Sequence, residues 1–104
     1  MRGVLNELRR YGKPVYVTEN GLATQDEAWR ERYLTEVLGE VYRAIEDGVD
    51  VRGYFHWTNM DNFEWARGYT CHFGLISVDR KTQERAIKPS GRAYARIATA
   101  NGLN

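Results

Sequence analysis

Residues 14–21 read Pro-Val-Tyr-Val-Thr-Glu-Asn-Gly, a short β-favouring run that ends in a carboxylate, an amide and a glycine. A buried parallel strand is typically a short, nearly continuous apolar run of this kind. Glu19 then stands at the carboxyl end of the strand, where α/β barrels and open α/β sheets place their chemistry. Gly21 permits a sharp exit that a bulkier residue would resist. The same residues also fit an ordinary polar turn, because a motif this short arises by chance.

The composition of the chain is that of a soluble globular protein of one domain, with 104 residues, 42% of them hydrophobic and 28% charged. A net charge of +1 gives no electrostatic reason to expect nucleic acid or an acidic membrane surface as a partner. Cys71 is the single cysteine, which excludes an internal disulfide and favours a reducing, cytoplasmic compartment. No apolar run reaches the roughly 18 residues of a transmembrane helix, and the N-terminus lacks a signal-peptide core.

Helical patterns lie on both sides of the first strand. Residues 2–11 predict the end of a helix, and Gly12 stands where a helix-closing glycine belongs. Thr24 and Glu27 fit a capping box that begins a long helix, which we expect to end near Asp47. The predicted packing stripe of this helix comprises Trp29, Tyr33, Val37, Val41 and Ala44, joined by Leu34, Leu38 and Ile45.

A second strand is predicted over residues 49–57, so strands and helices alternate and the two strands should be parallel. Residues 58–88 are too long for an ordinary loop and suggest a functional insertion, with a small hairpin formed by residues 73–79 and 83–87. Pro89 suits the first turn of a last helix that ends near residues 101–102. Two parallel strands leave open edges and an uncovered face, which predicts one sector of a larger α/β structure.

The second strand also delivers chemistry to its carboxyl end, where Trp57 is followed by Asp61, Glu64 and Trp65. Carboxylates accept hydrogen bonds from neighbouring sugar hydroxyls, and indole faces cover the C–H faces of a sugar ring. Taken singly, Trp57 fits a core residue and the two carboxylates fit loop caps or solvated charges. Parallel strands bring their carboxyl ends to one face, which places Glu19 beside this cluster and favours a carbohydrate site.

Several segments together resemble glycoside hydrolase family 1, the β-glucosidases, β-galactosidases and their relatives. The first is Val-Thr-Glu-Asn-Gly at residues 17–21, which resembles the family's nucleophile motif. The others, in the family's order, are Gly53-Tyr54-Phe55-His56-Trp57, Asp61-Asn62-Phe63-Glu64-Trp65, Gly68-Tyr69, Phe73-Gly74-Leu75, Lys88-Pro89-Ser90 and Tyr94. The resemblance implies an α/β fold, namely a fragment of a TIM (β/α)8 barrel. Residues 1–104 would form its C-terminal sector: the end of helix 6, strand 7, helix 7, strand 8 and helix 8.

The resemblance also implies roles for individual residues. Glu19 resembles the catalytic nucleophile of a retaining β-glycosidase, and Trp57 resembles the platform under the sugar in the cleavage subsite. Glu64 and Trp65 resemble the residues that bind the hydroxyls of the non-reducing sugar, and Phe73 resembles an aromatic lining of that subsite. Residues 20–21 are expected to act as positioning residues only. The implied substrate is a β-glycoside or oligosaccharide, and no cofactor is implied.

The chain departs from the family's pattern in two ways. Residues 58–60 and Arg67 differ from what relatives usually carry near the binding loop, which puts substrate preference in doubt but leaves Glu19 untouched. In addition, no Asn-Glu-Pro occurs, although the family's acid/base carboxyl lies in such a motif. Retaining hydrolysis needs two carboxyl groups about 5–5.5 Å apart, so the chain alone is expected to be inactive.

The sequence is also compatible with other functions, although metal binding has little support. His56, His72 and Cys71 lack the spacing of a metal-ligand set, and Cys71 most simply fills a small buried space. A second hypothesis is a non-catalytic part-barrel that pairs with itself or with a complementary chain through its strand edges. A third is a vestigial sugar-binding piece. An adjacent reading frame that encodes Asn-Glu-Pro would favour a split or excised enzyme over these alternatives.

Overall fold

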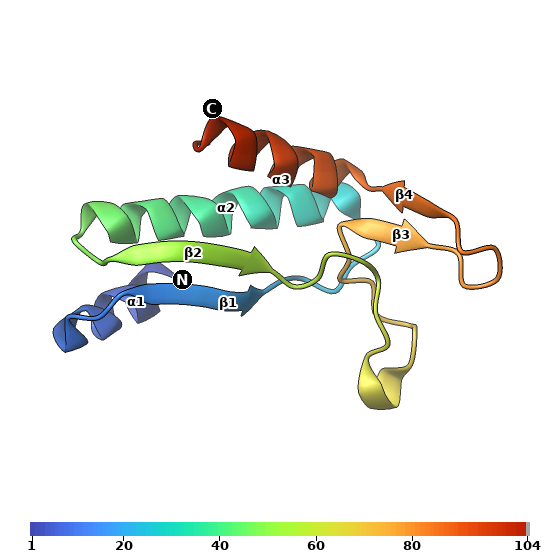
Figure 1. Cartoon of the computed structure of the whole chain (residues 1–104), viewed down its shortest axis with the longest axis horizontal. Coiled ribbons are helices and arrows are strands. Elements are labelled where there is room, and N and C mark those ends of the chain that lie inside the picture. The colour runs from blue at the N-terminus through green and yellow to red at the C-terminus, as the bar shows by residue number, and fades with distance from the viewer. Residues whose placement is uncertain (104) are drawn as a thin grey trace.

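The computed structural model of the chain describes residues 1–103 and contains a helix–strand–helix–strand unit followed by a loop, a hairpin and a last helix (Figure 1). The order of strands and helices predicted from the sequence is confirmed. The bounds are α1 Arg2–Leu8, η1 Arg9–Tyr11, β1 Val15–Asn20, α2 Glu27–Glu46, β2 Val51–His56, η2 Trp65–Arg67, β3 Ile76–Val78, β4 Arg85–Ile87 and α3 Pro89–Ala100.

The first helical segment ends as the sequence predicts. After Leu8 the helix tightens into η1, and Gly12 follows in the left-handed region at φ 59°, with its N–H donating to the carbonyl of Arg9. Lys13 and Pro14 then lead into β1. Glycine is favoured at such a position because its φ is open to both signs.

The start of α2 differs from the predicted capping box. Asp26 is the N-terminal cap, and its Oδ1 accepts the backbone N–H of Trp29 at 3.0 Å. Thr24 instead accepts the N–H of Asp26, and the Glu27 carboxylate turns away to Arg30 and Ser90. The prediction of Thr24 as the cap was therefore wrong, because Arg30 and the distant Ser90 bind the Glu27 carboxylate and keep it away from the helix end.

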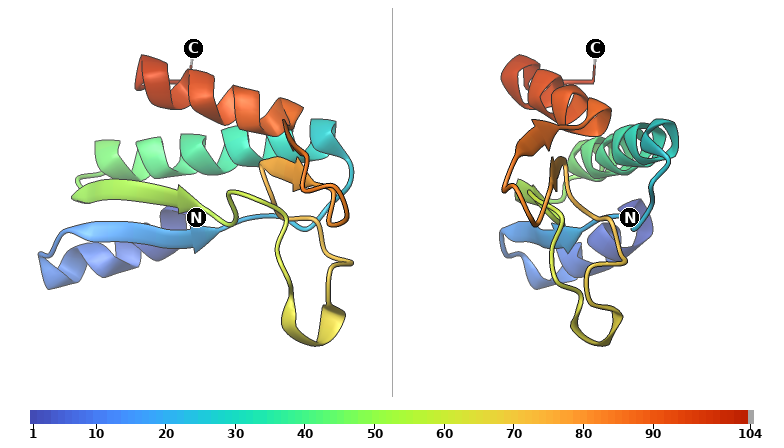
Figure 2. Two further views of the ribbon diagram at one scale, coloured as in Figure 1. Left: turned by 45° about the vertical axis from the view of Figure 1, so that its right-hand side comes forward. Right: turned by 90° about the vertical axis from the view of Figure 1, so that its right-hand side faces the viewer.

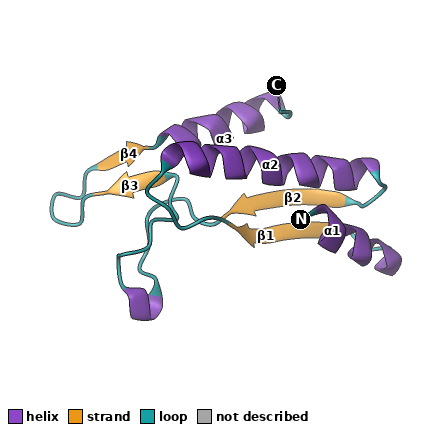
Figure 3. Ribbon diagram, turned by 180° about the vertical axis from the view of Figure 1, so that it is seen from behind, coloured by secondary structure: helices purple, strands orange, loops and turns teal. Residues whose placement is uncertain are grey.

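Strands β1 and β2 pair in parallel, as predicted, and one face of this sheet carries the helices. Figure 2 shows α1 and α2 on one side of the sheet, and Figure 3, a view from behind, shows α2 along β2 and α3 alongside α2. The core on that side comprises Leu5, Val17, Val41, Ala44 and Val49, with Met1, Val15, Val51 and Tyr54 packed against it. The other face exposes Tyr16 and Phe55, which are 54% and 58% accessible.

The second strand is shorter than residues 49–57. The N–H of Val49 donates to the carbonyl of Ala44 and so still belongs to the turn after α2. The strand ends at His56, and Trp57 is the first residue beyond it. The hairpin is antiparallel as expected, although each of its strands has only three residues.

The packing stripe of α2 also differs from the prediction. The buried residues are Arg30, Leu34, Val41 and Ala44, whereas Trp29 and Ile45 are each 46% exposed. Arg30 is thus the buried residue near the start of the helix, where the predicted stripe had Trp29. No helix in residues 1–103 has the length and apolarity to cross a membrane.

Candidate active site

Glu19 is the second-last residue of β1 and its side chain is exposed. The strand register explains this exposure. Val17 pairs with Tyr54 and Asn20 pairs with His56, so β1 has one residue more than β2 between these pairs. Val17 is buried in the core and the Asn20 side chain binds Tyr33 of α2, so both face the helices. The irregularity leaves Thr18 and Glu19 exposed between them, and such irregularities commonly re-aim side chains beside active sites.

The ends of the two strands are locked together by backbone contacts at Asn20, Gly21 and Trp57, which we call the strand-end junction. The N–H of Trp57 donates to the carbonyl of Asn20 at 2.9 Å. A Cβ on Gly21 would overlap with the carbonyl group of Trp57. Gly21 is therefore required by a close approach of two backbones rather than by the sharp exit that the sequence suggested. The junction holds Glu19 and Trp57 on neighbouring strand ends.

Phe73 is brought to the same place by the returning chain. Its carbonyl accepts the N–H of Thr58 at 3.4 Å and lies 3.3 Å from Nε2 of His56. Further on, Leu75 donates to the carbonyl of Thr58 at 3.0 Å. Residues that follow β2 and residues that precede β3 thus run side by side at the carboxyl end of the sheet.

Glu64 and Trp65 lie on a loop that projects from the strand ends, with η2 at its tip (Figure 1). The Nδ2 atom of Asn62 donates to Oε2 of Glu64 at 2.8 Å, and Trp65 is 82% exposed. Within residues 1–103 no hydrogen bond joins Glu64 to Glu19. Backbone hydrogen bonds thus join Trp57 to Asn20, the residue after Glu19, and Phe73 to Thr58, the residue after Trp57. Glu64 and Trp65 lie on the adjoining loop.

Asp61 anchors the base of this projecting loop. Its Oδ1 accepts the N–H of Gly74 and the ammonium of Lys88, both at 2.8 Å, and its Oδ2 lies 3.3 Å from Nδ1 of His72. Burial alone would raise the pKa of the Asp61 carboxyl, but the hydrogen bonds from Lys88, Gly74 and His72 outweigh it and hold the pKa below its usual range. The interpretation of Asp61 as a loop residue with a structural task agrees with these contacts.

His56 lies at the end of β2, and the centroid of its ring is 6.3 Å from the centroid of the Tyr94 ring. Burial lowers the pKa of the imidazole, and the hydrogen bond to the carbonyl of Phe73 offsets this only in part. A neutral ring that donates from Nε2 to Phe73 satisfies this geometry. His56 thus joins β2 to the returning chain.

A fully buried arginine, which the sequence interpretation missed, secures the loop after Glu19. The guanidinium of Arg30 donates to the carbonyls of Leu22 and Thr24 and to Oε1 of Glu27. The other oxygen of Glu27 accepts the hydroxyl of Ser90 at 2.6 Å. Arg30 is in helical phase with Leu34, one turn later, so a charged residue within the apolar stripe was the available signal.

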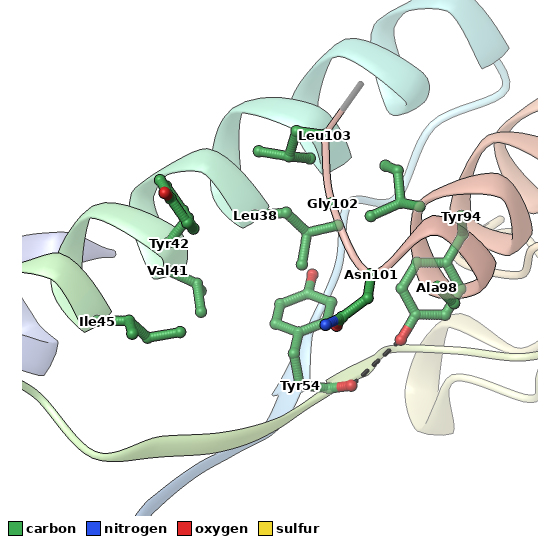
Figure 4. A pocket seen from close by; sticks show the side chains of 11 residues that line it. Leu38, Val41, Tyr42, Ile45, Tyr54, Tyr94, Ala98, Asn101, Gly102 and Leu103 are labelled. Carbon is green, nitrogen blue, oxygen red and sulfur yellow. Dashed lines mark hydrogen bonds between the residues drawn. The ribbon is translucent and has the colours of Figure 1, made fainter.

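A cleft of about 680 Å³ lies between α2 and α3, over β2 (Figure 4). Its lining contains none of the five predicted site residues; it comprises Leu38, Val41, Tyr42, Ile45, Tyr54, Tyr94, Ile97, Ala98, Asn101, Gly102 and Leu103. The cleft is on the helix side of the sheet, so it is separate from the exposed Glu19. Among residues 1–103 no three histidine, cysteine or acidic side chains are grouped to hold a metal ion.

A parallel strand–helix unit with a carboxylate and an indole at the carboxyl ends of its strands has the arrangement of one sector of an α/β barrel. The chain belongs to glycosyl hydrolase family 1, whose sequence profile matches residues 1–103. The resemblance stated from the sequence is thereby confirmed, and the TIM-barrel fold of this hydrolase family is the fold of which the chain is a part.

Individual relatives give the same result. The chain is 43% identical over 100 residues to a β-galactosidase of Sulfolobus acidocaldarius, covering 96% of this chain and 20% of that protein. It superposes on a β-glycosidase of Pyrococcus horikoshii with a TM-score of 0.90 and 48% identity, covering 93% and 23% of the two chains. It superposes on the β-glucosidase of Thermotoga maritima in complex with glucoimidazole with a TM-score of 0.92 and 38% identity, covering 99% and 26%. The chain thus spans about a fifth to a quarter of the length of these relatives.

Proposed function

We propose that the chain is the C-terminal sector of a retaining β-glycosidase and carries its nucleophile, Glu19. In this proposal residues 1–104 are one sector of a single barrel domain. The end of helix 6 corresponds to α1, strand 7 to β1, helix 7 to α2, strand 8 to β2 and helix 8 to α3. The observation that carries the proposal is the strand-end junction, which holds an exposed Glu19 beside Trp57 at the carboxyl end of a parallel sheet.

Chemically, Glu19 acts as the nucleophile in the first of two steps. One carboxylate oxygen forms an ester bond to the anomeric carbon while the glycosidic C–O bond breaks, and the leaving oxygen takes the electron pair and a proton from a general acid. In the second step water attacks the anomeric carbon, gives its proton to the same acid/base group, and releases Glu19 as a carboxylate. The stereochemistry at the anomeric carbon is retained.

The remaining predicted residues bind the sugar. Trp57 provides the platform under the ring, and Phe73 lines the same subsite. Glu64 accepts hydrogen bonds from neighbouring hydroxyls, with Asn62 orienting its carboxylate at 2.8 Å. Trp65, exposed on the projecting loop, contributes to the same non-reducing sugar site once the rest of a barrel faces it. The substrate is a β-glycoside or a β-linked oligosaccharide.

The acid/base group comes from another part of the barrel, because no Asn-Glu-Pro occurs in the 104 residues. Chain 1–104 alone is therefore expected to give no significant hydrolysis of an aryl β-glucoside. The whole barrel can be supplied by a chimera in which this chain replaces the matching part of the Thermotoga maritima β-glucosidase, of which it covers 26%. We call this protein the chimeric barrel.

In the chimeric barrel, Glu19→Gly is expected to abolish hydrolysis of an aryl β-glucoside. Azide should restore release of the aryl group, because the small anion enters the space that the carboxylate vacates. The product should be the α-glycosyl azide, identified by NMR, since attack from the nucleophile's side inverts the anomeric carbon. The matched control is Glu84→Gln in the exposed hairpin, which should leave hydrolysis unchanged. Hydrolysis by Glu19→Gly without azide, or a folded but unrescued variant, contradicts the nucleophile role.

A second candidate function, a non-catalytic assembly module, is favoured by the uncovered face of the β1–β2 sheet. Tyr16 and Phe55 are more than half exposed on that face. An assembly module needs only to complete a folded chimeric barrel, and it does so whether or not Glu19 is present. A glycosidase sector also needs Glu19 for hydrolysis. Hydrolysis that depends on Glu19 therefore separates the two functions.

A further inference from the structure

Asn20, which directly follows Glu19 in β1, is contacted by side chains of two other elements, β2 and α2. Its side-chain oxygen Oδ1 accepts the hydroxyl of Tyr54 from β2 at 2.9 Å and lies 3.3 Å from the hydroxyl of Tyr33 from α2. The Tyr54 hydroxyl is also 3.4 Å from the carbonyl oxygen of Asn20. From α3, Tyr94 donates its hydroxyl to the carbonyl of Tyr54 at 3.1 Å (Figure 4). The side-chain amide of one residue in β1 thus accepts hydrogen bonds from two phenols that belong to separate elements.

The direction of these hydrogen bonds is set by chemistry. An amide oxygen only accepts, so both phenols must donate to it, and each must therefore remain protonated. Burial raises the pKa of Tyr54, which keeps its hydroxyl a donor across the working range of pH. A half-buried amide oxygen left without donors costs free energy, so Asn20 has a strong preference for this one orientation.

The orientation of Asn20 bears directly on Glu19. Residue 17 is fixed in the core and residue 20 is fixed by the phenols, both on the helix side, and β1 carries its extra residue between them. The backbone of Glu19 is thereby held at both ends. We infer that Tyr33, Tyr54 and Asn20 form a positioning network that aims the Glu19 carboxylate at the sugar. This inference rests on the proposed function and assigns no contact between the network and the substrate.

The test uses the chimeric barrel with Tyr33→Phe and Tyr54→Phe combined, which removes both donors and keeps both rings. We expect kcat for an aryl β-glucoside, and the rate at which an activated 2-deoxy-2-fluoroglycoside labels Glu19, to fall tenfold or more. The inhibition constant of glucose should stay within twofold, since the sugar-binding residues are intact. Tyr94→Phe is the matched control: it removes one phenol bond from the same layer but not from Asn20, and should change kcat less than twofold.

Two outcomes overturn the inference. One is that the double variant is labelled at Glu19 at a rate within twofold of that of the parent chimeric barrel. The other is equal loss in the double variant and in Tyr94→Phe, which would mean that any phenol of this layer serves only stability. Glu19→Gln is measured alongside. If Glu19→Gln is active, the proposed function fails; if it is inactive while the double variant is fully active, only the positioning network fails.

Discussion

At the residue scale, Gly21 is the least replaceable position of the strand-end junction. A Cβ there overlaps with the carbonyl group of Trp57, a backbone atom that cannot rotate away. Gly21→Ala in the chimeric barrel should lower the free energy of unfolding by about 1–3 kcal/mol, the usual cost of overpacking. It should also lower kcat, because separating the two strand ends moves Glu19 relative to Trp57. Denaturant unfolding and steady-state kinetics measure the two effects.

Gly3→Ala is the control for that prediction. Gly3 lies in α1 with nothing within 4 Å of an added Cβ. Alanine is the better helix former by up to about 1 kcal/mol, so this variant should be neutral or slightly more stable. If Gly21→Ala behaves like Gly3→Ala, the close approach does not constrain the site.

Single residues differ in how far the sequence can predict them. Glu19 and Trp57 were placed at strand ends because each follows a local apolar run, and the structure has them there. The partners of Asp61 could not be predicted, because Gly74 and Lys88 lie 13 and 27 residues further along the chain. The sequence marked Gly21 as a special position. The reason that glycine is required there is the path of the second strand, which no local sequence pattern contains.

At the element scale, the N-terminus of α2 joins the loop after Glu19 to the start of α3. Arg30 and Glu27 supply this connection, and Arg30 is fully buried. Arg30→Met should destabilise the chimeric barrel by about 3–5 kcal/mol, since it leaves Glu27 uncompensated and the carbonyls of Leu22 and Thr24 without a donor. Denaturant unfolding measures the loss, and limited proteolysis should show earlier cleavage within residues 21–26.

Arg32→Met is the matched substitution for Arg30→Met, since Arg32 is exposed on the same helix. A surface change of this kind should stay within about 0.5 kcal/mol. Equal effects of the two substitutions would show that the buried contacts of Arg30 contribute nothing.

The existence and order of the elements were predictable because helix and strand periods are local. Their ends were less so. Thr24 and Glu27 have the spacing of a capping box, yet the structure uses Asp26 as the cap because Glu27 is bound by Ser90, 63 residues away. Arg30 was missed for the same reason: its partners are carbonyls of a loop whose path only the folded chain defines.

At the scale of the whole molecule, the chain is less compact than a self-sufficient domain of its size. Its radius of gyration is 15.1 Å, whereas about 13 Å is expected for this length. Its accessible surface is 7148 Å², whereas about 6,000 Å² is expected for a folded monomer of this mass. The excess fits a structure in which one face and both outer edges of a parallel sheet remain uncovered.

The uncovered face predicts how the isolated chain 1–104 behaves in solution. Tyr16 and Phe55 lie open there, and each large side chain left in water forfeits roughly 1.5–3 kcal/mol of burial. A domain has only about 5–15 kcal/mol of net stability, so a few such residues consume it. We therefore expect the isolated chain to self-associate, or to require the complementary part of a barrel, with weak protection of the β1 and β2 amides from hydrogen exchange.

Sedimentation velocity across a concentration series measures the association of the isolated chain. Combining Tyr16→Lys with Phe55→Lys should shift the distribution toward monomer, because charges on the open face oppose pairing. Tyr42→Lys, at a tyrosine that is 57% exposed on the helix side, should leave it unchanged. A monomer at all concentrations with strongly protected strand amides would contradict this prediction, because it would require a closed packing of the sheet within one chain.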